Sequence, residues 1–219
     1  MTKDKTYLML ACPILRDEIM MAAAQTAVKF PILFIPTDLH QTPEKLKAYL
    51  QNAIDNLFHV DVIILPMGRC GNGTLGLKSD RATIVLPKCD DCISLILSKE
   101  SFQVERPKYT YFLTDGWLRE KGAINNEYDR TREKYGEEKA KMVMDMLYGS
   151  YKYFSLMDTG TYDLATAKEK VRPLAELVQL EINSLPGYCG VLKKMMRLEF
   201  DENFIIVPAG EEVKEEHFT

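Results

Sequence analysis

The run Val60-Asp-Val-Ile-Ile-Leu-Pro66 decides the fold that this sequence predicts. It is almost continuously apolar, which is typical of a strand covered on both faces of a parallel sheet. Four other runs share this character: 6–12, 31–36, 82–86 and 108–113. Helix-like segments alternate with them, such as 14–29 and the segment that Thr42-Pro43 opens and Leu57 ends. This alternation predicts an α/β fold with a doubly wound, mostly parallel, Rossmann-like sheet.

The pattern changes after Trp117. The sequence predicts long, charged helices over 126–154 and another helix over 163–183. It predicts a short strand over 204–208 that adds to the sheet. A chain of 219 residues fits one α/β domain. We therefore expect a single domain over 1–219, with a helical appendage or insertion over 118–200 packing on it. The stretch 211–219 is expected to be a frayed tail.

Composition excludes some classes of function. The net charge is −4 and no basic stripe stands out, so we expect no nucleic acid as partner. No apolar run approaches the ~20 residues of a membrane span, and no signal peptide is visible, so we expect no membrane association. Five cysteines, an odd number, favour reduced thiols and a cytoplasmic location.

Four of the five cysteines stand just after strand-like runs. Cys12 closes the first run, Cys70 follows the run 62–69, and Cys89 and Cys92 form a Cys-x-x-Cys after the run 83–88. The carboxyl ends of parallel strands share one edge of a sheet, where ligands bind. Soft sulfur ligands select zinc, copper(I) or an iron–sulfur cluster. The sequence therefore predicts a metal centre held by these four thiols, and it leaves Cys189 outside the pattern.

The kind of centre stays open at this point. We expect helix N-termini to lower the thiol pKa at Cys12 and Cys92, which favours the thiolate. Four thiolates could close a zinc site, whereas three would leave an open position, which also suits a 4Fe–4S cluster. Two alternatives compete: buried cysteines that act only as small apolar side chains, and a redox dithiol at Cys89 and Cys92.

A glycine-rich stretch surrounds Cys70. It reads Gly68-Arg-Cys-Gly-Asn-Gly-Thr-Leu-Gly76, with four glycines in nine residues. Glycines let the backbone approach a ligand and expose amides that can hold an anion. A tight turn without ligand is the alternative, but the embedded cysteine favours a site. The predicted cofactor-binding residues are Gly68, Gly71, Asn72, Gly73 and Thr74.

Other polar residues follow strand-like runs and are candidates for catalysis. Thr37, Asp38 and His40 follow the second run, and Thr114-Asp115-Gly116-Trp117 follows the fifth. His40 could act as a ligand or general acid/base. Arg69 could hold the anionic part of a substrate. The candidate catalytic residues are His40, Arg69 and Asp115.

Several strings together resemble one family, the domain-of-unknown-function family numbered 1638. They are Ala11-Cys12 with Arg16 and Glu18, the stretch 68–77, Pro87-Lys-Cys-Asp-Asp-Cys-Ile-Ser-Leu95, and Tyr111-Phe-Leu-Thr-Asp-Gly-Trp117. The resemblance covers the chain from its first strand to Gly210. The family pattern carries thiols at Cys12, Cys70 and Cys92, is variable at Cys89, and commonly has proline at Asp115.

The resemblance implies a context in anaerobic prokaryotes, often beside corrinoid-dependent methyltransferase systems. It supports an iron–sulfur cluster or zinc, and possible use of a corrinoid, in one-carbon metabolism. A non-catalytic corrinoid or metal accessory protein and a zinc thiolate methyltransferase are the alternatives. The expected partner is a small-molecule substrate or a corrinoid protein, and a homo-oligomer is left open.

Overall fold

Apolar, β-branched runs form the parallel strands of the first sheet. The computed structural model describes residues 5–36, 39, 42–102, 104–119 and 124–219. Its contacts divide the chain into two compact units, a first unit of Met1–Val104 with Tyr188–Thr219 and a second unit of Glu105–Gly187. The prediction of one domain with an insertion over 118–200 stays a prediction, and each unit is described by itself below.

The first unit contains a five-stranded sheet in the order β2-β1-β3-β4-β8. The first four strands are parallel, and β8 runs antiparallel beside β4. The strands are β1 (Tyr7–Ala11), β2 (Ile32–Phe34), β3 (Val62–Ile64), β4 (Thr83–Pro87) and β8 (Phe204–Val207). Met9 lies opposite both Ile32 and Ile64, and the core strands β1, β3 and β4 are buried on both faces. The predicted α/β fold with a mostly parallel, doubly wound sheet is confirmed.

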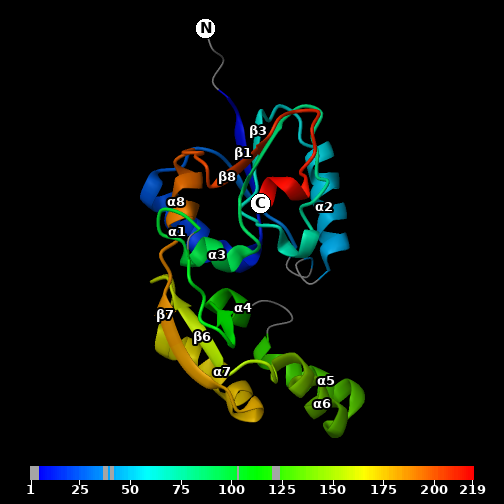
Figure 1. The fold of residues 1–219 in the computed structure, drawn as a ribbon, viewed down its shortest axis with the longest axis vertical. Coiled ribbons are helices and arrows are strands. Elements are labelled where there is room, and N and C mark those ends of the chain that lie inside the picture. Colours follow the sequence, from blue (N-terminus) through cyan, green and yellow to red (C-terminus); the bar gives the residue numbers. More distant parts are fainter. Residues whose placement is uncertain (1–4, 37–38, 40–41, 103, 120–123) are drawn as a thin grey trace. The chain divides into compact units, whose positions relative to one another are not determined.

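Helices cover both faces of this sheet. They are α1 (Arg16–Thr26), α2 (Pro43–Asp55), α3 (Cys92–Leu97) and α8 (Gly190–Met196), with 3₁₀ turns η1 (Pro13–Leu15), η3 (Cys70–Asn72) and η5 (Glu215–Phe218). Figure 1 shows α2 on one side of the strands and the packed pair of α1 and α8 on the other. The chain order reverses at β1, so the crevice between β1 and β3 is the topological switch point of the sheet.

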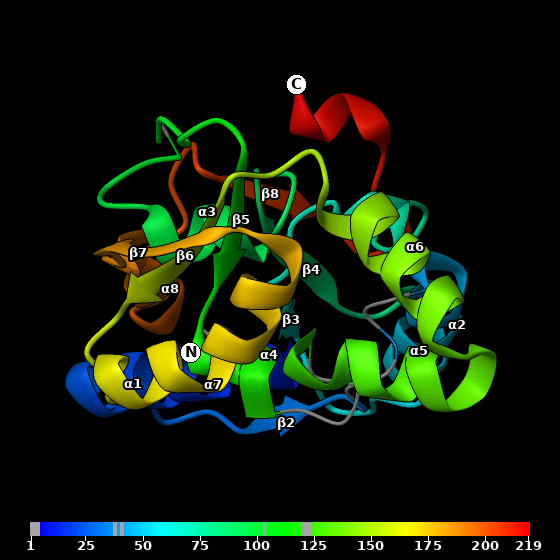
Figure 2. The same cartoon turned by 90° about the horizontal axis from the view of Figure 1, so that it is seen from below.

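The second unit has its own three-stranded parallel sheet in the order β5-β6-β7. Its strands are β5 (Thr110–Leu113), β6 (Tyr153–Asp158) and β7 (Glu181–Pro186). Its helices are α4 (Asp115–Arg119), α5 (Glu127–Tyr135), α6 (Glu137–Tyr148) and α7 (Leu164–Val178), with the 3₁₀ turn η4 (Ile124–Asn126). Edge-on aromatic pairs among Tyr111, Tyr148 and Phe154 join strands to helix in its core. Figure 2 shows α5 and α6 as a helical hairpin, with α7 packed on β6 and β7.

Three sequence-based expectations were wrong. Residues 153–158 and 181–186 are strands, although we expected long helices to extend to residue 154 and another helix to extend to residue 183. Helix α7 stops because Gln179 adopts a left-handed conformation with φ 56°. The C-terminal stretch is not frayed, because Val213 is buried and exchanges hydrogen bonds with Gly76 and Leu77. No helix in the described ranges is long and apolar enough to cross a membrane.

Candidate metal centre

The carboxyl edge of the first sheet carries the cysteines that the sequence singled out. Cys12 directly follows β1, the segment Gly68–Cys70 comes a few residues after β3, and Cys89 and Cys92 follow β4. These strands are adjacent, and β1 and β3 flank the switch point. Ligands of open α/β sheets bind in this crevice. The predicted placement of the four cysteines after neighbouring parallel strands is therefore found.

Backbone contacts bring two of the cysteine segments together. The amide of Arg69 donates to the carbonyl oxygen of Cys89, and the amide of Cys70 donates to that of Asp90, both at 2.8 Å. Gly68 allows this approach, because a Cβ atom there would lie 2.4 Å from the Cys89 carbonyl oxygen. The loop after β3 is therefore fixed against the turn after β4.

The four thiols influence one another electrostatically. Burial, followed by the Cys12 thiol and the Asp91 carboxylate, raises the pKa of Cys70 to about 12. Burial also raises the pKa of Cys92, with further contributions from Cys70, Cys12, Asp91 and Cys89. We expected the helix N-terminus to lower the pKa of Cys92, and this was wrong because burial and the neighbouring acidic groups outweigh the helix dipole.

As placed, the thiols do not form a ligand set. All five cysteines are thiols rather than disulfides. The Cys89 thiol lies 3.3 Å from the carbonyl oxygen of Asp91, to which it donates. In the described part of the chain, no group of three or more His, Cys, Asp or Glu side chains has metal-binding geometry. The chemistry of the donors fits a soft metal, but their side chains would have to turn toward a common point to bind it.

The glycine-rich stretch is explained largely by packing. Cys70, Gly71 and Asn72 have φ values of 47°, 62° and 77°, so all three residues are in the left-handed conformation. Glycine and asparagine adopt this conformation more readily than other residues, which accounts for two of the three positions. A Cβ atom on Gly73 would lie 2.9 Å from Leu46 Cδ2 of α2. The amide of Gly73 donates to the Cys70 carbonyl oxygen at 3.1 Å. These contacts give the glycines a structural role in holding the loop between α2 and β4.

Thr74 and Arg69, two further predicted site residues, are also engaged within the protein. The Thr74 hydroxyl donates to the Gly68 carbonyl oxygen at 3.0 Å. The Arg69 guanidinium donates to Asn72 Oδ1 at 2.7 Å and pairs with Glu215 Oε1 at 2.5 Å. Arg69 thus fastens η5 to the glycine-rich stretch. Nothing in the sequence pattern signalled Glu215, because the residues lie 146 positions apart.

The other two candidates for catalysis are Asp115 and His40. Asp115 belongs to the second unit, where its carboxylate pairs with Lys170 Nζ and with Arg119 Nε, each at 2.8 Å. The hydroxyl of Thr114 beside it is buried with no hydrogen-bond partner among the described residues. His40, with Thr37 and Asp38, lies outside the described residues.

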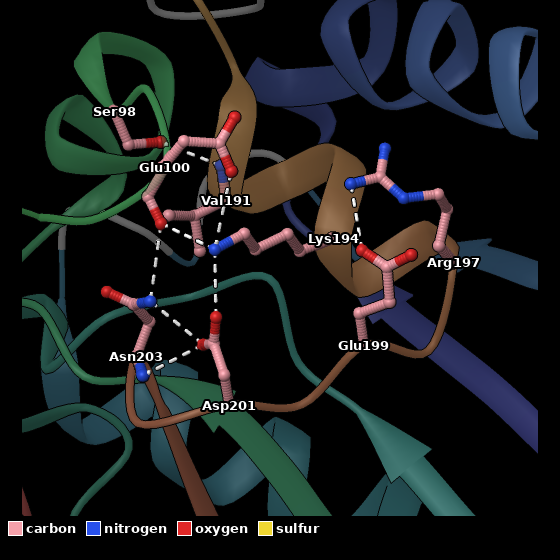
Figure 3. Close-up of polar contacts among 8 residues, drawn as sticks. All are labelled: Ser98, Glu100, Val191, Lys194, Arg197, Glu199, Asp201 and Asn203. Carbon is pink, nitrogen blue, oxygen red and sulfur yellow. Dashed lines mark hydrogen bonds and ion pairs between the residues drawn. The ribbon is translucent and has the colours of Figure 1, made fainter.

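Lys194, Asp201 and Asn203 form a polar network that the sequence did not reveal (Figure 3). Lys194 Nζ donates to the Glu100 carbonyl oxygen at 2.7 Å and to Asp201 Oδ2 at 2.8 Å. Asn203 Nδ2 donates to Asp201 Oδ1 at 2.8 Å, and the Asn203 carbonyl accepts from the amide of Lys88 at 2.8 Å. Lys88 immediately precedes Cys89, so the network holds the start of the Cys-x-x-Cys turn.

Cys189 differs from the other four thiols. It is fully buried at the start of α8, and burial followed by the Glu18 carboxylate raises its pKa to about 12. No other cysteine contributes to that shift. The sequence-based decision to leave Cys189 out of the site is consistent with this environment.

Fold and site together define an α/β protein with four buried or partly buried thiols at the edge of its main sheet, beside the switch point. The chain belongs to the family described as "Protein of unknown function (DUF1638)", whose model matches residues 34–196. The matched range includes Cys70, Cys89 and Cys92 and begins after Cys12. Searches of the curated proteins and of the solved structures each found no match.

Proposed function

We propose that the first unit binds a soft metal centre through Cys12, Cys70 and Cys92, with Cys89 as an optional fourth donor. The centre is an iron–sulfur cluster or a zinc ion. The observation that carries the proposal is that thiols follow three neighbouring strands at one edge of the sheet, with two of the strand-end segments joined by backbone hydrogen bonds. Such centres are selected by soft sulfur donors, and these donors lie where open α/β sheets bind ligands.

The raised thiol pKa values fit this role. A buried thiol next to other acidic groups keeps its proton in the absence of a cation, because a thiolate there would be poorly solvated and repelled. A bound metal cation removes both costs, so the protons leave as the metal enters. The same shifts argue against the redox alternative, since attacking cysteines of dithiol enzymes have lowered pKa values.

The chain's own residues would position the centre. The hydrogen bonds from Arg69 and Cys70 to Cys89 and Asp90 hold two ligand segments side by side. Asp91 caps α3 by accepting from the Ser94 amide at 3.2 Å, which fixes the start of the helix at Cys92. Three thiolates leave one position of the metal open, and an open metal position supplies Lewis-acid chemistry to a small substrate.

The context of the centre rests on other grounds. A role in one-carbon or corrinoid-linked metabolism, with a small molecule or a corrinoid protein as partner, is supported by the family resemblance alone. Five thiols without a disulfide are favoured by a reducing compartment, and we place the protein in the cytoplasm on that basis.

Anaerobic purification followed by elemental analysis and absorption spectroscopy tests the proposal. We expect a brown protein with several irons and sulfides per chain, or one tightly bound zinc. The variants Cys70→Ser and Cys92→Ser should lose the metal, whereas Cys189→Ser, a matched buried thiol of the same unit, should keep it. A wild-type protein that holds neither metal, even after reconstitution with iron and sulfide or with zinc, would refute the proposal.

A further inference from the structure

The first unit has a hollow at the amino edge of its sheet, which is the edge opposite the cysteines. It has a volume of about 720 Å³ and is lined by the start of β1, the connection from α1 to β2, the approach to β3 and the end of α8. This volume is within the range of small-molecule sites, which is roughly 300–1,000 Å³. None of the residues of the thiol cluster lines it, so it is a separate candidate site.

The wall of this hollow is apolar and partly aromatic. Tyr7 and Phe30 contribute rings whose centroids are 6.2 Å apart, and Leu8 and Met196 contribute nearly buried side chains. Apolar and aromatic walls with a few polar groups are characteristic of ligand pockets. The wall therefore suits a ligand with an apolar body.

The charged side chains that line the hollow in the described part of the chain are all cationic. The Asp61 carboxylate, which accepts from the amide and hydroxyl of the lining residue Thr6, is itself outside the lining. Lys5, Lys29 and Arg197 line it together with His59, and none of the described lining residues is an aspartate or glutamate. The chain as a whole has more acidic than basic residues, 32 against 28, so a lining without carboxylates is not a reflection of composition. A cationic rim over an apolar wall selects an anionic head group on an apolar body.

One of these cations is partly neutralised. Arg197 Nη2 pairs with Glu199 Oε2 at 2.9 Å, and Figure 3 shows this pair beside the end of α8. Both side chains are about half exposed, at 42% and 53%. Glu199 is not a lining residue, so it competes with an incoming anion for the guanidinium from outside the hollow.

We propose that this hollow binds a small amphiphilic anion, with the head group at Lys5, Lys29 and Arg197 and the apolar body against Tyr7 and Phe30. The ligand is a free molecule of the size of an aryl sulfonate or a medium-chain carboxylate. Its site is independent of the metal centre, so the two proposals can fail separately.

Fluorescent probes test the proposal with the full chain. The probe 1-anilinonaphthalene-8-sulfonate carries an anionic head, and its neutral analogue N-phenyl-1-naphthylamine does not. We expect saturable binding of one sulfonate probe per chain. The double variant Lys5→Glu/Lys29→Glu should weaken this binding at least fivefold and leave the neutral probe within twofold. Lys45→Glu/Lys139→Glu, which changes two exposed lysines elsewhere, should have no effect.

A variant with the opposite sign sharpens the test. Glu199→Gln releases Arg197 and should tighten the sulfonate probe about two- to threefold, the scale of one exposed ion pair. Circular dichroism confirms that each variant is folded. Unchanged sulfonate binding in the lysine variant, or equal loss of both probes, would overturn the proposal. Lysine-dependent co-sedimentation with phosphatidylglycerol vesicles would assign the hollow to a membrane lipid and overturn the free ligand.

Discussion

The amide of Cys70 donates a hydrogen bond to the carbonyl oxygen of Asp90, at 2.8 Å. This contact joins the loop after β3 to the Cys-x-x-Cys turn after β4, and the neighbouring bond from Arg69 to Cys89 repeats it. Two thiol-bearing segments that are distant in sequence thereby have a fixed separation. The candidate centre depends on this backbone junction as much as on the cysteines.

The junction predicts a large effect of Gly68→Ala. The added methyl group would overlap the Cys89 carbonyl oxygen and the Asp91 amide, at 2.4 and 2.7 Å, so one strand-end loop must move. We expect a loss of about 2–4 kcal/mol in the free energy of unfolding and a loss of metal binding. Thermal and denaturant unfolding measure the first effect, and elemental analysis measures the second.

Gly210→Ala is the matched control for this substitution. Gly210 has φ 87° and open space where its Cβ atom would be, so only backbone strain is added. We expect a loss of about 1–2 kcal/mol with metal binding retained. Equal effects of the two substitutions on metal content would contradict the importance of the junction.

The raised thiol pKa values predict how the stability of the metal-free protein depends on pH. The unfolded chain releases its thiol protons near the ordinary value of 9.0, whereas Cys70 in the folded protein keeps its proton to about pH 12. The folded state thus binds more protons in this window, and stability falls as pH rises from 9 toward 12. The slope is at most about 1.4 kcal/mol per pH unit for each such group.

Denaturant unfolding of the metal-free protein at several pH values above 8 measures this slope. Cys70→Ser should flatten it, and Cys189→Ser should do so by a similar amount, because the pKa of Cys189 is also raised to about 12. Unchanged slopes in both variants would show that these thiols are not perturbed.

Metal binding should have the opposite dependence on pH. Each thiol that ligates the metal must lose its proton, so zinc affinity should rise with pH by up to about tenfold per pH unit for each proton released. A competition titration with a chromophoric chelator measures the affinity at several pH values. We expect a release of at least two protons in wild type and the same number in Cys189→Ser, whereas Cys92→Ser should show no measurable zinc binding. A pH-independent affinity would exclude thiol ligands.

The buried hydroxyl of Thr114 predicts a stabilising substitution in the second unit. Its oxygen has no partner among the described residues, so burying it costs free energy. Thr114→Val keeps the shape and removes the polar atom, and we expect a gain of about 1 kcal/mol in the free energy of unfolding. Ser155→Ala, which removes the hydroxyl that bonds Asn183, should instead destabilise. A destabilised Thr114→Val would show that the hydroxyl has a partner.

The network around Lys194 predicts a change that acts through the cysteine turn. Lys194→Met leaves Asp201 without its cation, and the lysine side chain is only 15% exposed, so we expect a loss of about 2–3 kcal/mol. Lys193→Met on the same helix is the control and should cost less than about 0.5 kcal/mol. Unfolding in urea measures both, and equal losses would contradict the bracing role.

The central strands of the first sheet follow from local sequence patterns, whereas strands β6 and β7 of the second unit depend on pairing between distant segments. The apolar runs before Cys12, Cys70 and Cys89 predicted the three central strands, because burial on both faces leaves a continuous apolar pattern. Strand β7 was missed because it is mostly exposed and follows α7 after a single left-handed turn at Gln179. Its identity as a strand comes from its pairing with β6, which no local pattern reports.

The position of the candidate site could also be predicted from the sequence, but the contacts of its residues could not. The sequence predicted that the four cysteines lie at one edge of the sheet, because each follows a strand and the carboxyl ends of parallel strands share an edge. Arg69 and Thr74 were predicted to contact a ligand, but in the structure they bond to the protein itself. Arg69 pairs with Glu215, which is remote in sequence, and Thr74 bonds to Gly68 across the closed loop. The direction of the Cys92 pKa shift could not be predicted from its helix position, because it depends on burial and on thiols from other strands.

X-ray absorption spectroscopy at the edge of the bound metal tests the central claim most directly. For the protein loaded with zinc, we predict at least three protein-derived sulfur ligands at about 2.3 Å. The triple variant Cys12→Ser/Cys70→Ser/Cys92→Ser should lose them, whereas Cys189→Ser should be unchanged. A first shell of oxygen and nitrogen alone, or a sulfur shell that survives in the triple variant, would contradict a metal centre at the switch point of this sheet.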